Sequence, residues 1–247
     1  MRDRPSTKRR FAVFDIDGTL YRWQLFHELV EELVKQQALA DPDGLLGQTW
    51  NEWRGGKLSF HDYEHKLMHD VLYKNLVDVS VKAFDAACQA VVESSGHKVH
   101  KYTADLLKDL QDQGYFTIAI SGSQQELLDR FCVRYGFDIA VGALYERQQG
   151  RFTGRLERST FGRKAEILKE LVGQYNLTFT DSLAIGDSDS DIEILELVEQ
   201  PIAFNPSEGL FDRAQTAGWP IVIERKNMAY RLERNHDKLV LAKTIVL

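Results

Sequence analysis

A short apolar run that stops on two acids constrains the fold of this 247-residue chain most strongly. Phe11 to Phe14 predict a buried strand, and Asp15, Asp17 and Gly18 follow it closely. Glycine adopts the backbone angles that a sharp exit from a strand requires. Because ligands bind beyond the carboxyl ends of strands in an open parallel sheet, the acids are candidates for a functional site. Carboxylates this close repel each other, and a hard divalent cation, Mg²⁺ first, would relieve the repulsion. The alternative is a pair of helix caps.

From Tyr102 onward, apolar runs and helical patterns alternate along the chain. The predicted strands are 116–121, 138–141, 183–187, 201–204 and 221–223, and the predicted helices are 103–113, 124–135, 162–175 and 192–198. Residues 144–156 predict a hairpin that turns at Gln149-Gly150. This alternation is typical of a parallel sheet with right-handed crossovers, so the predicted fold class is α/β.

A block of helical patterns, residues 21–100, separates the first strand from the others. Such a block is far longer than an ordinary connection, so we expect a separate helical module over the two acids, as a cap or lid. The predicted domains are a core of residues 1–20 and 101–247 and a cap of residues 21–100. The C-terminal residues 226–247 predict a closing helix or a dimer contact.

Composition excludes some classes of function. With 31 basic and 37 acidic residues the net charge is −6, which argues against nucleic-acid binding as the main activity. The two cysteines, Cys88 and Cys132, suggest no disulfide framework and fit a cytoplasmic protein. No apolar run approaches the roughly 18 residues of a membrane span, so no membrane anchor is expected.

Three further segments place polar residues at a strand end or a helix start. The predicted strand 116–121 ends in Ser121-Gly122-Ser123, where hydroxyl and amide groups can bind an anion or simply cap a helix. Another strand runs into Asp187 and Asp191, which can complete an oxygen-ligand shell or cap a helix. Lys164 begins a predicted helix, which is unfavourable for a cation unless an anion lies nearby. An ordinary surface lysine is the alternative.

In this order, Asp-x-Asp-Gly-Thr, Ser-Gly, Lys and Gly-Asp-Ser-x-x-Asp resemble the motifs of the haloacid dehalogenase superfamily of phosphohydrolases. The resemblance extends from residue 11 to about residue 222, and it is greatest to the branch that includes phosphoserine phosphatase. It implies a Rossmann-like parallel-sheet core of three α/β/α layers with an inserted α-helical cap domain. It also implies an Mg²⁺-dependent phosphatase for a small phosphorylated metabolite.

The resemblance assigns roles to four acids. Asp15 would be the nucleophile that accepts the phosphoryl group, and Asp17 would protonate the leaving oxygen and then activate water. The metal would be held by the Asp15 carboxylate, the Asp17 backbone carbonyl and Asp187, with Asp191 supporting that shell. The second acid, Asp17, favours phosphoester chemistry over dehalogenation.

The resemblance also assigns the phosphate site. Ser121 and the Gly122 amide would bind the phosphoryl oxygens, and Lys164 would neutralise their charge. Thr19 would fix the turn after the first strand. Asp189 has no counterpart in the family and is expected to be solvated.

The predicted cap holds weaker candidates for substrate contacts. Where phosphoserine phosphatases carry a Glu and an Arg for the substrate amine and carboxylate, this chain has Gln24 and Leu67. These cannot pair with either charge, so we expect poor activity on phosphoserine. Trp23 either lines a substrate pocket with two other tryptophans or belongs to the core of the cap. Arg54 either meets a substrate anion or faces solvent.

Other activities fit the same motifs. A phosphotransferase would pass the phosphoryl group from Asp15 to an alcohol other than water. A non-catalytic regulatory protein on the same fold is disfavoured, because both Asp15 and Asp17 are present. A membrane-lipid phosphatase is disfavoured by the lack of a predicted anchor.

Overall fold

A nine-stranded sheet runs through the computed structural model, which describes residues 8–41, 44–236 and 238–247, with His61 described by its backbone alone. The strand order is β4-β3-β2-β1-β5-β6-β7-β8-β9. The strands are β1 (Arg9–Phe14), β2 (Phe116–Gln124), β3 (Ile139–Gln148), β4 (Arg151–Arg158), β5 (Leu177–Gly186), β6 (Gln200–Phe204), β7 (Ile221–Arg225), β8 (Met228–Asn235) and β9 (Lys238–Val246). The six strands β1, β2, β3, β5, β6 and β7 are parallel to their neighbours in this central group, which confirms the α/β prediction.

The first strand lies at the centre of the sheet and is buried on both faces. Successive side chains of a strand point to opposite faces. Phe11 and Val13 accordingly join one apolar cluster, and Ala12 and Phe14 join another. A strand that is apolar along its whole length is therefore explained by its central position between two layers of helices.

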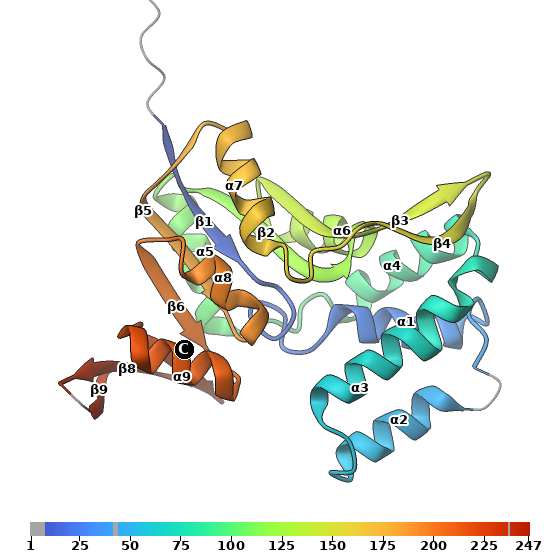
Figure 1. Ribbon diagram of the computed structural model, residues 1–247, viewed down its shortest axis with the longest axis horizontal. Coiled ribbons are helices and arrows are strands. Elements are labelled where there is room, and N and C mark those ends of the chain that lie inside the picture. The colour runs from blue at the N-terminus through green and yellow to red at the C-terminus, as the bar shows by residue number, and fades with distance from the viewer. Residues whose placement is uncertain (1–7, 42–43, 237) are drawn as a thin grey trace, which may run out of the picture.

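Helices cover both faces of the sheet, as the three-layer prediction requires (Figure 1). On one face lie α5 (Lys101–Asp112) and α6 (Gln125–Tyr135), whose leucines and Phe131 pack in the cluster of Phe14. On the other face α7 (Lys164–Gln174), α8 (Ile192–Leu195) and α9 (Glu208–Ala217) pack in the cluster of Phe11. A short 3-10 turn, η3 (Asp189–Asp191), precedes α8.

Residues 21–100 contribute helices and no strand of the sheet within the described part of this segment. They form α1 (Leu25–Lys35), α2 (Leu45–Arg54), α3 (Phe60–Lys66), the π-helix η1 (Leu67–Tyr73), the 3-10 turn η2 (Leu76–Asp78) and α4 (Val81–Ser95). The division into a core and a cap remains a prediction, and residues 1–7 of the predicted core lie outside the described residues.

Backbone hydrogen bonds hold the two ends of the helical segment together and join the segment to the β3–β4 hairpin. Its entry and exit lie side by side, because the Arg22 amide donates to the Lys98 carbonyl at 2.9 Å. At the far side, the Val81 amide donates to the Gly150 carbonyl at the tip of the β3–β4 hairpin, at 3.0 Å. The rings of Phe84 and Phe152 meet beside this contact with their centroids 4.9 Å apart. The hairpin and the segment thus pack as neighbours (Figure 1).

The β3–β4 hairpin and the C-terminal segment test two of the sequence predictions. The hairpin turns at Gln149 and Gly150 as predicted, and both residues have a positive φ, as the tight turns of hairpins require. The prediction of a closing C-terminal helix is wrong. The segment forms the antiparallel strands β8 and β9, in which Tyr230 pairs with Thr244. The alternative of a dimer contact remains a prediction.

Candidate active site

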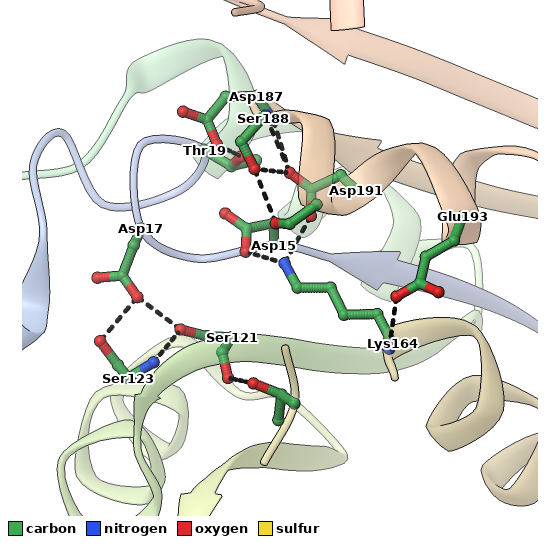
Figure 2. Close-up of polar contacts among 12 residues, drawn as sticks. Asp15, Asp17, Thr19, Ser121, Ser123, Lys164, Asp187, Ser188, Asp191 and Glu193 are labelled. Carbon is green, nitrogen blue, oxygen red and sulfur yellow. Dashed lines mark hydrogen bonds and ion pairs between the residues drawn. The ribbon is translucent and has the colours of Figure 1, made fainter. Parts of the chain in front are cut away.

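The carboxyl ends of β1 and β5 bring the predicted acids together (Figure 2). Asp15 follows β1, and its amide donates to the Ile185 carbonyl of β5 at 3.0 Å. Asp187 follows β5 directly, so the parallel pairing of the two strands places both acids at one edge of the sheet. Asp15 is only 4% exposed, although ionised acids are seldom buried without a partner.

Lys164 is the buried partner of two of these acids. Its Nζ lies 2.8 Å from Asp15 Oδ1 and 2.6 Å from Asp191 Oδ1. The lysine stands at the first residue of α7, and its amide donates to Glu193 Oε1 at 2.7 Å. Glu193 therefore compensates the exposed amides of this helix start, while the ammonium group turns into the site. The alternative of an ordinary surface lysine is wrong.

Burial and the neighbouring charges both shift the pKa values of Lys164 and Asp15. Burial disfavours the ammonium form of Lys164, but contact with Asp15 and Asp191 raises the pKa of Lys164 above its usual value. Burial raises the pKa of Asp15 to about 7, since the opposing effect of Lys164 is offset by the charges of Asp191 and Asp17. The site therefore holds more negative charge than its one lysine neutralises.

Asp15, Asp187 and Asp191 form a group that could hold a metal ion, with ligand oxygens that all lie within 4.8 Å of one another. Burial and the neighbouring acids raise the pKa of Asp187 well above its usual value. Asp15 Oδ2 is buried and has no hydrogen-bond partner among the described residues. Carboxylate oxygens are the ligands that Mg²⁺ prefers, so these residues fit a hard divalent cation. Thr19 Oγ1 donates to Asp187 Oδ1 at 3.1 Å and so orients this acid.

Two glycines let the acids approach the backbone. Gly18 has φ of +84°, and a Cβ at this residue would lie 2.1 Å from Asp187 Oδ2. A Cβ at Gly186 would lie 2.4 Å from the Asp191 side chain. Both acids therefore occupy space that any other residue type at these two positions would fill.

The Asp17 carboxylate lies outside this acidic group and points toward the end of β2 (Figure 2). Ser121 Oγ and Ser123 Oγ donate to Asp17 Oδ2 at 2.5 and 2.7 Å, and the Leu25 amide donates to Asp17 Oδ1 at 2.5 Å. Burial raises the pKa of Asp17, although these three hydrogen bonds oppose the shift. The predicted metal contact through the Asp17 carbonyl remains a prediction.

The predicted phosphate-binding residues lie beside these acids. Ser121 is fully buried, and its hydroxyl donates to Asp17 in this structure. Gly122 is exposed, and, apart from Gly122 itself and its two chain neighbours, no described residue has an atom within 4 Å of where its Cβ would be. The backbone at Gly122 thus borders open space next to the site. The predicted roles of these residues toward phosphate remain predictions.

Sequence reasoning did not assign a role to Ser123 or Thr160. Ser123 follows Ser121 by two residues, and this alternation places both hydroxyls on the same side of β2, so the signal was available. Thr160 Oγ1 donates to the Ser121 carbonyl at 2.9 Å from a segment far along the chain. Nothing in the sequence around Thr160 indicates this contact.

Asp191 and Asp189, two further acids that follow β5, differ in their contacts. Asp191 Oδ2 accepts hydrogen bonds from the Ser188 amide and hydroxyl, both at 3.0 Å, so this acid also shapes its own loop. Asp189 is exposed as expected, but its carboxylate also accepts a hydrogen bond from the Leu210 amide at 2.9 Å, at the start of α9.

The weaker candidates lie in the helical segment. Gln24 is the buried residue before α1, and Leu67 is fully buried in the apolar core. Trp23 packs against other aromatic rings of the segment, with its ring centroid 5.3 Å from that of Trp53. Arg54 is exposed at the end of α2, with its guanidinium carbon 6.0 Å from the centroid of the Trp53 ring. The structure thus associates Trp23 with core packing, and the substrate role of each candidate remains a prediction.

An open α/β sheet that gathers carboxylates, a buried lysine and hydroxyl donors beside its strand ends has the arrangement of a candidate active site that could hold a metal ion. The family model of haloacid dehalogenase-like hydrolases matches residues 12–196, and the chain therefore belongs to this family.

Similar proteins include two curated phosphatases. The chain is 27% identical over 211 residues to a phosphoserine phosphatase of Archaeoglobus fulgidus, a match that covers 84% of this chain and 56% of that protein. It is 22% identical over 223 residues to a phosphoserine phosphatase of Methanocaldococcus jannaschii, covering 90% of this chain and 95% of that protein. The chain thus spans little more than half the length of the first relative and nearly all of the second.

A solved structure has the same fold. It is a phospho-aspartyl intermediate analogue of phosphoserine phosphatase, with a TM-score of 0.59, 21% identity and coverage of 89% of this chain and 95% of that chain. The chain is thus a haloacid dehalogenase-like hydrolase, and it is similar to phosphoserine phosphatases in sequence and in fold. Among the described helices, none is both long enough and apolar enough to cross a bilayer.

Proposed function

We propose that the protein hydrolyses a small-molecule phosphate monoester, with Mg²⁺, through an aspartyl-phosphate on Asp15. The observation that carries the proposal is the Asp15 carboxylate. Lys164 binds its Oδ1, while Oδ2 is buried at the carboxyl end of the strand and has no partner in the part of the chain that the structure describes. An oriented carboxylate oxygen of this kind is suited to in-line attack on phosphorus.

In the first step, Asp15 Oδ2 forms a bond to phosphorus while the bond from phosphorus to the alcohol oxygen breaks. Asp17 donates its proton to that leaving oxygen, and the raised pKa of Asp17 favours the protonated form that this step needs. Asp17 then accepts a proton from water, which attacks phosphorus and releases phosphate and the Asp15 carboxylate. Asp15, Asp187 and Asp191 would hold the metal, which supplies positive charge to the phosphoryl oxygens when bound.

The phosphoryl oxygens would replace Asp17 as the partner of Ser121, with the Gly122 backbone beside them. Lys164 would keep its contact with Asp15 and add positive charge next to the transferred group. Asp17 would thereby be released from one of its three donors and become free to approach the leaving oxygen.

Phosphoserine is a poor substrate in this proposal, although the two curated relatives carry that name. Leu67 is buried in the apolar core and Gln24 is uncharged, so neither neutralises the charges of phosphoserine. The relatives support the reaction type, and the side chains of the helical segment argue for a different alcohol.

The test is hydrolysis of a panel of phosphate monoesters with Mg²⁺, by the wild type and Asp15→Asn. Turnover should be lost in Asp15→Asn, and a radiolabelled phosphoryl group should attach to the wild type in a base-labile form. Asp189→Asn is the matched control, because its carboxylate lies in the same acidic run but bonds to the start of α9. An Asp15→Asn variant that keeps wild-type turnover would overturn the proposal.

A further inference from the structure

The end of β2 bulges out of the regular ladder of the sheet. Its pairing with β3 is interrupted between Ile120 and Gln124, and in this interval residues 121–123, the β2 bulge, lie opposite Gly142 alone. A Cβ at Gly142 would lie 2.5 Å from the Ser123 carbonyl oxygen, so the glycine lets the bulge approach β3 closely. Bulges are frequent next to active sites, where they re-aim groups of the chain. The backbone of the β2 bulge is thus released from regular pairing beside the candidate active site.

Thr160 holds one peptide of the β2 bulge, the peptide between Ser121 and Gly122. The Thr160 hydroxyl donates to the Ser121 carbonyl at 2.9 Å, and the two residues are only 2% and 0% exposed. No other side chain in the described part of the protein donates to this carbonyl. A buried carbonyl outside the ladder is costly without a partner, so Thr160 compensates it.

The same hydrogen bond fixes the direction of the Gly122 amide. The peptide is planar and trans, so its carbonyl and its N–H point in opposite directions. Because the carbonyl points to Thr160, the N–H of the exposed Gly122 points away from Thr160. A peptide next to glycine rotates easily when its carbonyl is not held. Donation to the carbonyl also polarises the peptide and makes its N–H a stronger donor.

The segment that carries Thr160 also places Lys164. The Arg163 amide donates to the Thr160 carbonyl at 3.1 Å, which closes a turn between β4 and α7. Helix α7 begins directly after this turn with Lys164, whose ammonium group is buried among the acids of the site. The turn is therefore joined to the β2 bulge at its first residue and leads into the site at its last.

On the basis of the proposed phosphatase function, we propose that Thr160 is a positioning residue for the phosphoryl group. Thr160 holds the peptide between Ser121 and Gly122 so that the Gly122 N–H, together with the Ser121 hydroxyl, faces the transferred phosphoryl oxygens. A donor that is aimed in advance at the place where negative charge develops stabilises the transition state without reorganisation. Thr160 touches no reacting atom itself, and its effect passes through this peptide.

The test replaces Thr160 with Val, which has nearly the same shape but no hydroxyl, and with Ser, which keeps the hydroxyl. The measured quantities are kcat for the ester that the wild type hydrolyses fastest, and the inhibition constant of orthovanadate, an anion that takes up the five-coordinate geometry of phosphoryl transfer. Thr160→Val should lower kcat and raise the inhibition constant, each by about tenfold or more, which is part of the effect of removing such a donor altogether. Thr160→Ser should restore both values close to those of the wild type.

An inhibition constant does not depend on the fraction of the protein that is active, so it separates positioning from a loss of folded protein. Thr117→Val is the matched control. Thr117 is fully buried at the other end of β2, and its hydroxyl donates to Asp138 Oδ2 at 3.1 Å. Loss of this buried hydrogen bond should lower the melting temperature, but kcat and the inhibition constant should keep their wild-type values.

The outcomes separate this inference from the proposed function. The role of Thr160 is overturned, and the phosphatase function left standing, if Thr160→Val keeps the wild-type inhibition constant, or if Thr160→Ser or Thr117→Val raises it as much. A wild-type protein that hydrolyses no ester of the panel overturns the proposed function, and the role of Thr160 with it.

Discussion

Replacing Lys164 with Met would remove the one ammonium group that lies between two buried carboxylates. Lys164 is 4% exposed, and it contacts Asp15 Oδ1 at 2.8 Å and Asp191 Oδ1 at 2.6 Å. Methionine fills much of the space of the lysine stem, so the apolar contacts of the stem are largely kept. The change in stability therefore reports mainly the loss of the charge.

The expected loss of unfolding free energy follows from burial. Breaking a buried ion pair by removing one partner costs about 3–5 kcal/mol, because the other charge stays buried without compensation. For a chain of this size, each kcal/mol changes the melting temperature by about 2–4 °C. The melting temperature of Lys164→Met should thus fall by roughly 6–20 °C at neutral pH.

The loss should become smaller as the pH falls. The raised pKa of Lys164 means that its contribution is fully present below about pH 10.5 and is lost only at higher pH, so it is constant near neutrality. Without Lys164, the pKa of Asp15, already about 7 in the wild type, rises further. The folded variant then binds more protons than the unfolded chain below that pKa, and acid restores part of its stability.

The assay is thermal unfolding followed by circular dichroism, at about pH 8 and about pH 5.5, with a chelator present so that no metal ion replaces the lost charge. Lys169→Met is the control, since Lys169 is exposed on the same helix and its loss should change the melting temperature little. A loss of less than about 1 kcal/mol, the range of surface ion pairs, would refute the reasoning. A loss that grows as the pH falls would refute the assigned role of the carboxylates.

Two other changes test the acids separately. Asp187→Asn removes one of three clustered carboxylates, so it should raise the melting temperature of the metal-free protein and reduce the rise that Mg²⁺ produces. In the wild type, Mg²⁺ at ten times its dissociation constant should add about 1.4 kcal/mol, and an equal Mg²⁺ effect in the variant would contradict the cluster as the metal site. Ser123→Ala removes a donor to Asp17, so the pKa of Asp17 should rise. The limb of the pH–rate profile that reports Asp17 should then move to higher pH, whereas Ser123→Thr should keep the wild-type profile; a shift to lower pH would count against the assignment.

The central strand and the acids that follow it could be predicted because the apolar pattern of the strand matches its place between two layers of helices. An apolar strand that is buried on both faces has to be central, and the acids that follow it have to lie at its carboxyl end. Asp15 and Asp187 are at such ends, which brought them together in the structure as expected.

The C-terminal strands were missed for a physical reason. Strands β8 and β9 extend one edge of the sheet, and most of their side chains are at least partly exposed, so no continuous apolar run marks them. Only the spacing of Tyr230 with Leu232, and of Leu239 with Leu241, has the period of two that indicates a strand. So short an alternation does not distinguish a strand from the closing helix that was one of the two predictions for this segment.

Replacing Lys164 is expected to change both the stability of the protein and its turnover, so the two effects have to be separated. The contact that compensates the buried Asp15 charge also occupies Oδ1 and leaves Oδ2 for the proposed attack on phosphorus. Loss of turnover in Lys164→Met thus has two physical sources, a less stable site and a nucleophile that is no longer oriented. Because acid restores stability but not orientation, turnover that stays low at about pH 5.5 while the protein is fully folded would assign the loss to orientation.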